Sequence, residues 1–242
     1  MSGFAALFRR DIRGIYRDGF LVAMTVYSLV IAAASRVIVR WIPVPHVELY
    51  VAPFIILTAT ALIGLVFGFA LIEERETRTS LLMRVLPVSP ATLTTYWAVV
   101  VGGFCLAIGL ASALIYGVRP VHMAAFLLLC SVAALGAPVV MLVLGTLASN
   151  KIEGLAVGKI ISGSSLLLVV VFVLPPSWHV MLFWYPWYWI YVGLLKAYAG
   201  QDLAGALAVN QLPVPLVAYA VVPFVVSVWG MIVLVQRFRR VI

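Results

Sequence analysis

The stretch LYVAPFIILTATALIGLVFGFALI, residues 49–72, decides the class of fold to which this chain belongs. It contains no Asp, Glu, Lys or Arg, and it ends where Glu73 opens a charged segment. A helix needs about 20 apolar residues to cross a hydrocarbon core of roughly 30 Å. Residues 49–72 are therefore predicted to form a transmembrane helix.

The composition of the whole chain agrees with a protein embedded in a membrane. Hydrophobic residues make up 65% of the 242 residues and charged residues 10%, and the mean hydropathy is +1.17. A soluble domain is nearer half apolar and about a quarter charged, so this chain has too little polar surface to cover itself in water. Disorder is excluded for the same reason. Two cysteines, Cys105 and Cys130, are too few for a secreted disulfide scaffold.

Six apolar runs follow one another along the chain. They predict an all-α polytopic membrane protein with six transmembrane helices in a single domain, residues 1–242. The predicted spans are residues 19–35, 49–72, 95–118, 121–149, 152–174 and 212–235.

The basic residues predict the orientation of these spans, because Lys and Arg gather on the cytoplasmic side of a membrane. With both termini in the cytoplasm, the 16 basic residues divide into twelve inside and four outside. The twelve are Arg9, Arg10, Arg13, Arg17, Arg75, Arg78, Arg84, Lys151, Lys159, Arg237, Arg239 and Arg240. The four are Arg36, Arg40, Arg119 and Lys196. This asymmetry, with attraction to anionic lipid, explains the net charge of +8 better than a nucleic-acid partner does.

The predicted spans carry no charged residue at depth, and this limits the classes of function. Proton- or sodium-coupled transporters usually keep ionisable residues inside the membrane. Ser162, Ser164 and Ser165 have no histidine within a span to serve as a base for hydrolysis. There is no Walker A sequence, so the energy for any work must come from another chain. No metal site is predicted, because the three histidines lie outside the spans or at their outer rim, far apart in sequence: His46, His122 and His179.

The cytoplasmic segments carry two amphipathic patterns. Residues 1–18 have apolar side chains at helical spacing and arginines on the opposite face, which predicts a helix lying in the membrane interface. A simple basic anchor is the alternative there. Residues 73–94 place an i, i+4 pair, Glu74 and Arg78, before an apolar stripe that Pro87 ends. This second pattern predicts a short helix that docks into a groove of a soluble partner, and a solvated loop is the alternative.

The acidic cluster, Leu-Leu and Leu-Pro-Val-Ser of this second segment resemble the permease subunits of ABC-2 type ABC transporters, especially those that export fluoroquinolones or other drugs. Residues 149–156, Ser-Asn-Lys-Ile-Glu-Gly-Leu-Ala, are similar to the second cytoplasmic loop of that family. The resemblance implies that residues 73–94 are a coupling segment that receives motion from an ATP-binding subunit. The implied coupling residues are Glu73, Glu74, Glu76, Leu81, Leu82 and Pro87, with a second cytoplasmic contact at Asn150, Lys151 and Glu153.

The same resemblance implies partners, location and cargo. A second permease subunit, identical or related, and ATP-binding subunits would complete an exporter in a bacterial plasma membrane. This chain is expected to be no enzyme and to bind no cofactor, with ATP and Mg on its partner. An uncharged path suits a hydrophobic or amphipathic compound, and drug, lipid, polyketide and peptide all remain open. A non-transporting membrane scaffold and a lipid-modifying membrane enzyme are the alternatives.

Residues 175–211, between the fifth and sixth predicted spans, are too long and apolar for a plain loop. Aromatic side chains crowd into them, and such rings prefer the membrane–water interface. Pro186 is expected to interrupt any helix there. One interpretation is an aromatic belt. The other is a partly re-entrant segment that closes the exit of a path, with an outer gate at Trp184, Trp187 and Trp189.

Small residues predict where the spans touch or bend. Two pairs of glycines have the GxxxG spacing of close helix contacts: Gly64 with Gly68, and Gly154 with Gly158. Gly136 and Pro138 are predicted to bend the fourth span.

Overall fold

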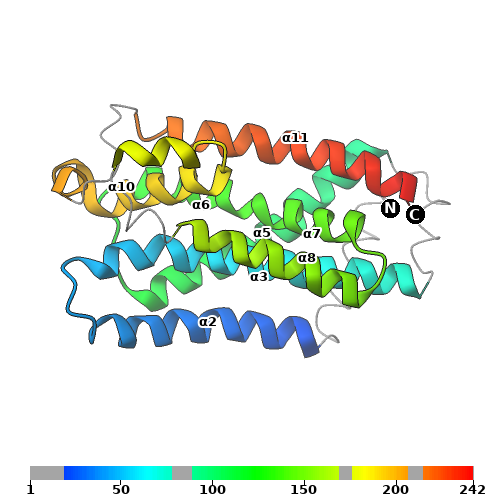
Figure 1. Ribbon diagram of the computed structural model, residues 1–242, viewed down its shortest axis with the longest axis horizontal. Helices are drawn as coiled ribbons and strands as arrows, with labels where there is room; N and C mark the ends of the chain where they lie inside the picture. The colour runs from blue at the N-terminus through cyan, green and yellow to red at the C-terminus, as the bar shows by residue number, and fades with distance from the viewer. Residues whose placement is uncertain (1–18, 78–88, 169–175, 207–214, 242) are drawn as a thin grey trace.

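The computed structural model describes residues 19–77, 89–168, 176–206 and 215–241 (Figure 1). Across these ranges the chain forms α-helices and short 3-10 helices, and no strand occurs in them. The helices α2, α3 and α11 run along the long axis of the molecule (Figure 1). The all-α prediction is confirmed for this part of the chain. The interfacial helix predicted at residues 1–18 lies outside the described residues.

Ten helical elements occur in the described ranges. In chain order they are α2 (Gly19–Val39), α3 (Val47–Glu76), α5 (Pro90–Tyr116), α6 (Met123–Ala134), α7 (Gly136–Leu147), α8 (Lys151–Ser164), η1 (Ser165–Leu168), η2 (Pro176–Leu182), α10 (Pro186–Ala206) and α11 (Ala218–Val241).

Five helical stretches in the described ranges are long and apolar enough to cross a membrane. They are Val22–Val39, Val47–Glu76, Ala91–Tyr116, Met123–Leu147 and Ala218–Phe238. These stretches correspond to five of the six predicted spans. The remaining one, predicted at residues 152–174, begins as α8 and η1, and its last residues lie outside the described part of the chain. A sixth crossing therefore stays a prediction.

Proline begins two helices that the sequence did not place there. The third span was predicted to start at residue 95, yet α5 begins at Pro90, where Ser89 is the N-cap and its Oγ accepts a hydrogen bond from the Thr92 amide at 3.1 Å. Pro186 was expected to interrupt any helix and is instead the first residue of α10. Both differences have one cause. The first residue of a helix needs no amide hydrogen for an internal bond, so proline fits there.

The helix α3 lies at the centre of the bundle and packs most extensively on α7. Its glycines make this approach close. A β-carbon at Gly64 would lie 2.7 Å from the Ala137 carbonyl oxygen, and one at Gly68 would lie 2.8 Å from the Leu144 Cβ. In the same way, α8 rests on α3 through the second glycine pair. A β-carbon at Gly154 would lie 2.7 Å from the Ile72 Cδ1. The predicted GxxxG contacts are confirmed.

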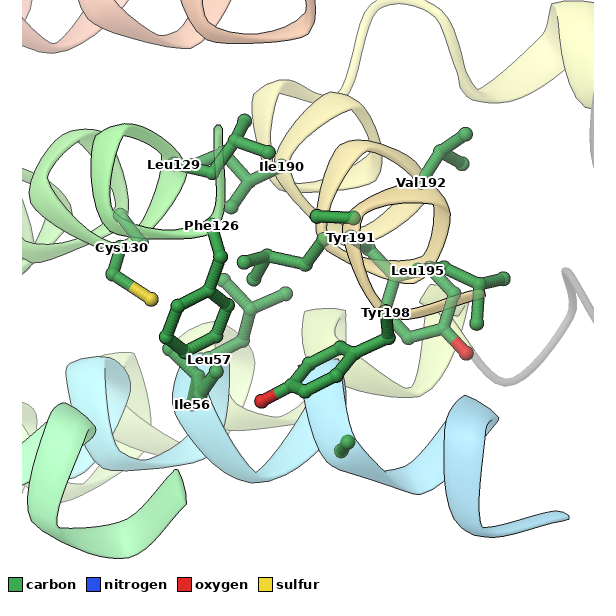
Figure 2. Close-up of a cluster of buried hydrophobic side chains, with 14 of the residues drawn as sticks. Ile56, Leu57, Phe126, Leu129, Cys130, Ile190, Tyr191, Val192, Leu195 and Tyr198 are labelled. Atoms are coloured by element: carbon green, nitrogen blue, oxygen red, sulfur yellow. The ribbon is translucent and has the colours of Figure 1, made fainter. Parts of the chain in front are cut away.

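The end of the bundle where α2 joins α3 holds a core of aromatic and aliphatic side chains. Figure 2 shows part of this core, with side chains from α3, α6 and α10 gathered together. The rings of Phe126 and Tyr198 lie edge to face with their centroids 5.2 Å apart. The Tyr191 hydroxyl donates to the Tyr50 carbonyl oxygen at 3.0 Å. The helix α10 is therefore built into the bundle and does not lie loosely on its surface.

The fourth span is interrupted at Leu135, and the bend predicted at Gly136 and Pro138 stays a prediction. Its first half, α6, ends at Ala134, and its second half, α7, begins at Gly136, with Leu135 between them. Pro138 has no amide hydrogen and cannot donate to the Ala134 carbonyl, so the helical ladder is interrupted at this point.

Candidate coupling site

The end of α3 and the start of α8 are joined by polar contacts. The Glu76 Oε1 accepts a hydrogen bond from the Lys151 amide at 3.0 Å. The Lys151 Nζ lies 3.2 Å from the Glu73 Oε2. In addition, Arg75 donates from Nη1 to the Ala148 carbonyl oxygen at 3.2 Å. We call this set of contacts the cytoplasmic junction, after the side of the membrane that the basic residues predict for it. Its partners come from segments about 75 residues apart in the sequence.

The α8 side of the junction is fixed by a helix cap. The Asn150 Oδ1 accepts from the Glu153 amide at 2.9 Å, and the Glu153 Oε2 accepts from the Ser149 amide at 2.7 Å. The Asn150 Nδ2 also donates to the Glu153 Oε1 at 3.2 Å. The bond to the Glu153 amide satisfies a donor that the first turn of a helix leaves unpaired, and the bond from the Ser149 amide holds the residue before the cap. The carboxylate also lies at the positive end of the helix dipole. The cap therefore sets the direction in which α8 leaves the junction.

The junction is open to solvent. The side chains of Lys151 and Glu73 are 53% and 60% exposed. An exposed ion pair of this kind contributes about 0–1 kcal/mol to stability, so its main effect is on geometry. Because its groups are accessible, a soluble partner can touch both segments at once.

The structure brings together most of the described residues that were predicted for coupling. Glu73, Glu74 and Glu76 lie in the last turn of α3, beside the first turn of α8. That first turn carries the second predicted group, Asn150, Lys151 and Glu153. The other predicted coupling residues, Leu81, Leu82 and Pro87, lie outside the described part of the chain. Arg75 was missed as a site residue, although its place between two predicted glutamates was a usable signal.

The three tryptophans predicted as an outer gate lie in different surroundings. Trp184 is 72% exposed, whereas Trp187 and Trp189 are half-buried. The Trp189 Nε1 donates to the Phe183 carbonyl oxygen at 2.9 Å, and its ring packs on the ring of Tyr219. The ring of Trp187 faces the break in the fourth span, since a β-carbon at Gly136 would lie 3.5 Å from its Cζ2. The gate itself stays a prediction.

One contact was not foreseen, between α8 and the segment predicted to lie outside the membrane, residues 175–211, which we call the outer segment. The Ser164 Oγ and the Tyr185 hydroxyl lie 3.0 Å apart. Ser164 is the last residue of α8, and Tyr185 directly precedes α10. The helix that begins at the cytoplasmic junction therefore ends against the outer segment.

Comparison with known proteins identifies a family of permeases that this chain matches. Residues 11–235 match the model of a family described as fluoroquinolones export permease protein Rv2686c-like. Two relatives from Mycobacterium tuberculosis are similar to this chain: fluoroquinolones export permease protein Rv2686c of strain H37Rv and fluoroquinolones export permease protein MT2760 of strain CDC 1551. Each is 28% identical over 204 residues, which cover 74% of this chain and 81% of the relative. No solved structure was found to match.

Proposed function

Because this chain belongs to the Rv2686c-like family of fluoroquinolone export permeases, we propose that it is the membrane-spanning subunit of an ATP-driven drug exporter. Membership in a drug-export permease family, which the sequence motifs predicted, is confirmed. The two relatives are named for fluoroquinolones, which are amphipathic, and the chain's uncharged spans suit such a cargo. We infer a fluoroquinolone-like substrate that is moved out of the cell.

The cytoplasmic junction is the observation that supports ATP-driven coupling. A separate ATP-binding subunit, which carries ATP and Mg, would bind at the end of α3 and at the segment that follows it. Glu76 and Lys151 link that end directly to α8. Motion of the ATP-binding subunit would then reach α3 and α8 together. Nucleotide binding would favour one arrangement of the helices, and the junction would transmit the bias.

The remaining architecture of the exporter follows from the same proposal. Residues 152–174 complete a sixth crossing, and both termini lie in the cytoplasm of a bacterial cell. The outer segment is re-entrant, and Trp184, Trp187 and Trp189 contribute to its gate. A second permease subunit, the same chain or a related one, completes the path. The exposed apolar side chains of α11, among them Phe224 and Trp229, face lipid or that second subunit.

Co-purification with the ATP-binding subunit tests the proposal. We expect Glu76→Ala to lower permease-stimulated ATP hydrolysis and drug export, because the Lys151 amide loses its acceptor. Glu76→Gln is the matched control, since its amide oxygen can still accept that bond. Glu73→Lys and Lys151→Glu are each expected to reduce stimulation, and the double exchange to restore part of it, because the ion pair is reversed.

Two outcomes would contradict the proposal in different ways. Full stimulation and export in Glu76→Ala and in both single charge reversals would remove the junction from the coupling route. In that case, charged replacements of Leu81 and Leu82 would test coupling through residues 78–88 instead. Failure of any ATP-binding subunit to co-purify, with export unaffected by ATP depletion, would reject the ATP-driven exporter itself.

A further inference from the structure

The break at Leu135 divides the fourth span into two equal halves. The helices α6 and α7 each have 12 residues. At a rise of about 1.5 Å per residue, each half is about 18 Å long. The break therefore lies near the middle of a hydrocarbon core of roughly 30 Å.

The two halves differ in the helix on which each packs most. The inner half, α7, interlocks with α3 through Gly64 and Gly68. The outer half, α6, packs most on α10, where a β-carbon at Gly193 would lie 3.0 Å from the Leu129 Cδ2. Both halves also pack on α5 and α11.

Backbone chemistry makes this connection weak. The Leu135 amide donates to the Val132 carbonyl oxygen at 3.2 Å, which is a tighter turn than the α-helix makes. Gly136 adds a residue of low helix propensity, and Pro138 removes one bond of the ladder. The other prolines within the described spans, Pro53 and Pro223, lie in helices that continue without a break. The combination at residues 135–138 sets this site apart from them.

A single aromatic ring fills the inner side of the break. A β-carbon at Gly136 would lie 3.5 Å from the Trp187 Cζ2 and 3.4 Å from the Thr60 Cγ2. Trp187 is the second residue of α10, the helix that holds α6. Just before it, Tyr185 meets Ser164 at the end of α8. The Trp187 ring therefore lies beside the break in the fourth span and beside α3. Tyr185, two residues before Trp187, connects this place to the end of α8.

We propose that the fourth span is a joint at Leu135–Pro138 and that Trp187 is the positioning residue that sets its angle. The inner half moves with α3 and the cytoplasmic junction, while the outer half stays with α10. Displacement of α8 reaches the ring through Ser164 and Tyr185. The use of this joint in drug export rests on the proposed function, whereas the existence of the joint does not.

Distance measurements between spin labels test the joint directly. Met123→Cys and Leu147→Cys place labels at the two ends of the span, both exposed, in the full chain reconstituted in lipid nanodiscs. Cys105 and Cys130 are buried and can stay in place. We expect a distance distribution with two maxima. In Pro138→Ala, and in Gly136→Ala/Pro138→Ala, the longer distance is expected to dominate, because the ladder can close and alanine fits beside Trp187.

A matched pair of labels controls for the proline alone. Val221→Cys and Val233→Cys are also exposed and bracket Pro223 in the unbroken α11. This pair is expected to give one narrow distribution. A single narrow distribution for the Met123–Leu147 pair as well, unchanged in Pro138→Ala, would overturn the joint whether or not an ATP-binding subunit is ever found.

The role of Trp187 has its own test. We expect Trp187→Ala to change the ratio of the two distances and to lower export by about tenfold, a shift of one order of magnitude in a two-state equilibrium. Trp187→Phe, which keeps an aromatic ring at the break, is expected to recover part of the ratio. The control is Trp41→Ala, since Trp41 is exposed in the link between α2 and α3. An unchanged ratio in Trp187→Ala, or an equal change in Trp41→Ala, would reject Trp187 as the residue that sets the angle.

Discussion

Lys196 brings a positive charge to the half-buried surface between α10 and α11. Its Nζ lies 2.8 Å from the Tyr219 hydroxyl and 4.7 Å from the centre of the same ring. Burial lowers the pKa of Lys196 from its ordinary value of 10.5, because water that would stabilise the ammonium is removed. Tyr219 offsets part of this loss by accepting a hydrogen bond and by presenting its ring to the cation.

The pKa of Lys196 predicts how stability depends on pH. Compared with the unfolded chain, the folded chain favours the neutral amine of Lys196. The charged form therefore lowers the free energy of unfolding at pH values below the pKa of Lys196 in the folded chain. That cost is lost progressively as the pH rises through the folded pKa towards 10.5. We expect the stability of the natural chain, relative to Lys196→Met, to increase between neutral pH and 10.5. Thermal unfolding of both proteins in detergent over this range measures the difference, and a constant difference would contradict the prediction.

The residues of the cytoplasmic junction show what a sequence can and cannot predict at this scale. Glu76 and Lys151 were each predicted from a loose motif. Their contact could not be, because 75 residues separate them and no local pattern encodes which helix ends meet. The cap formed by Asn150 and Glu153 is different. It is a local arrangement with a fixed spacing, and the sequence alone would support it.

At the scale of the helices, glycines decide how closely the spans approach. In lipid there is little hydrophobic drive between helices, so close backbone packing carries much of the association. The contact of α3 with α7 depends on it, because the Ala137 carbonyl oxygen and the Val140 side chain occupy the space beside Gly64.

Adding one methyl group at this contact is expected to lower the free energy of unfolding measurably. We expect Gly64→Ala to cost about 1–3 kcal/mol, as overpacking does in well-filled cores. The matched control is Gly103→Ala in α5, where a β-carbon would meet nothing within 4 Å. Both changes raise helix propensity alike, so the apparent unfolding temperatures in detergent isolate the packing effect. Equal unfolding temperatures for the two variants would contradict the prediction, because they would show that the contact between α3 and α7 accepts the methyl group without loss of stability.

The sequence predicted which helices carry contact glycines but not which helices they contact. The GxxxG spacing marks one face of a helix, and it carries no information about the opposing surface. Proline was misread at Pro186 for a related reason. The residue is unfavourable inside a helix and favourable at its first turn, and only the fold determines which of these applies.

At the scale of the whole molecule, the link from α2 to α3 and the link from α7 to α8 lie at opposite ends of the bundle. Trp41 in the first link is 83% exposed, and Ser149 in the second is exposed as well. Hydropathy predicted the five helical stretches that are long and apolar enough to cross a membrane, because burial in lipid requires an apolar surface on every side. It did not predict α10 as one helix of 21 residues. It could not settle residues 152–174, where α8 carries Glu153 and Lys159 beside apolar side chains.

Labelling of intact cells tests the predicted orientation. We expect a membrane-impermeant maleimide to label Trp41→Cys from outside and to label Ser149→Cys only after the cells are opened, because most basic residues belong on the cytoplasmic side. The buried Cys105 and Cys130 give a low background. Labelling of Ser149→Cys in intact cells, with Trp41→Cys protected, would reverse the topology and place the coupling residues outside.

The way α8 rests on the bundle has a mechanical consequence. Its fully buried residues are Gly154 and Gly158, and the half-buried Val157 and Ile161 pack beside them on the side chains of α3. Near its first turn it is held by Glu73 and Glu76 through Lys151. At its last residue, the Ser164 Oγ lies 3.0 Å from the Tyr185 hydroxyl. A helix held at both ends acts as a strut, so a displacement of its first turn is passed along its length to Tyr185.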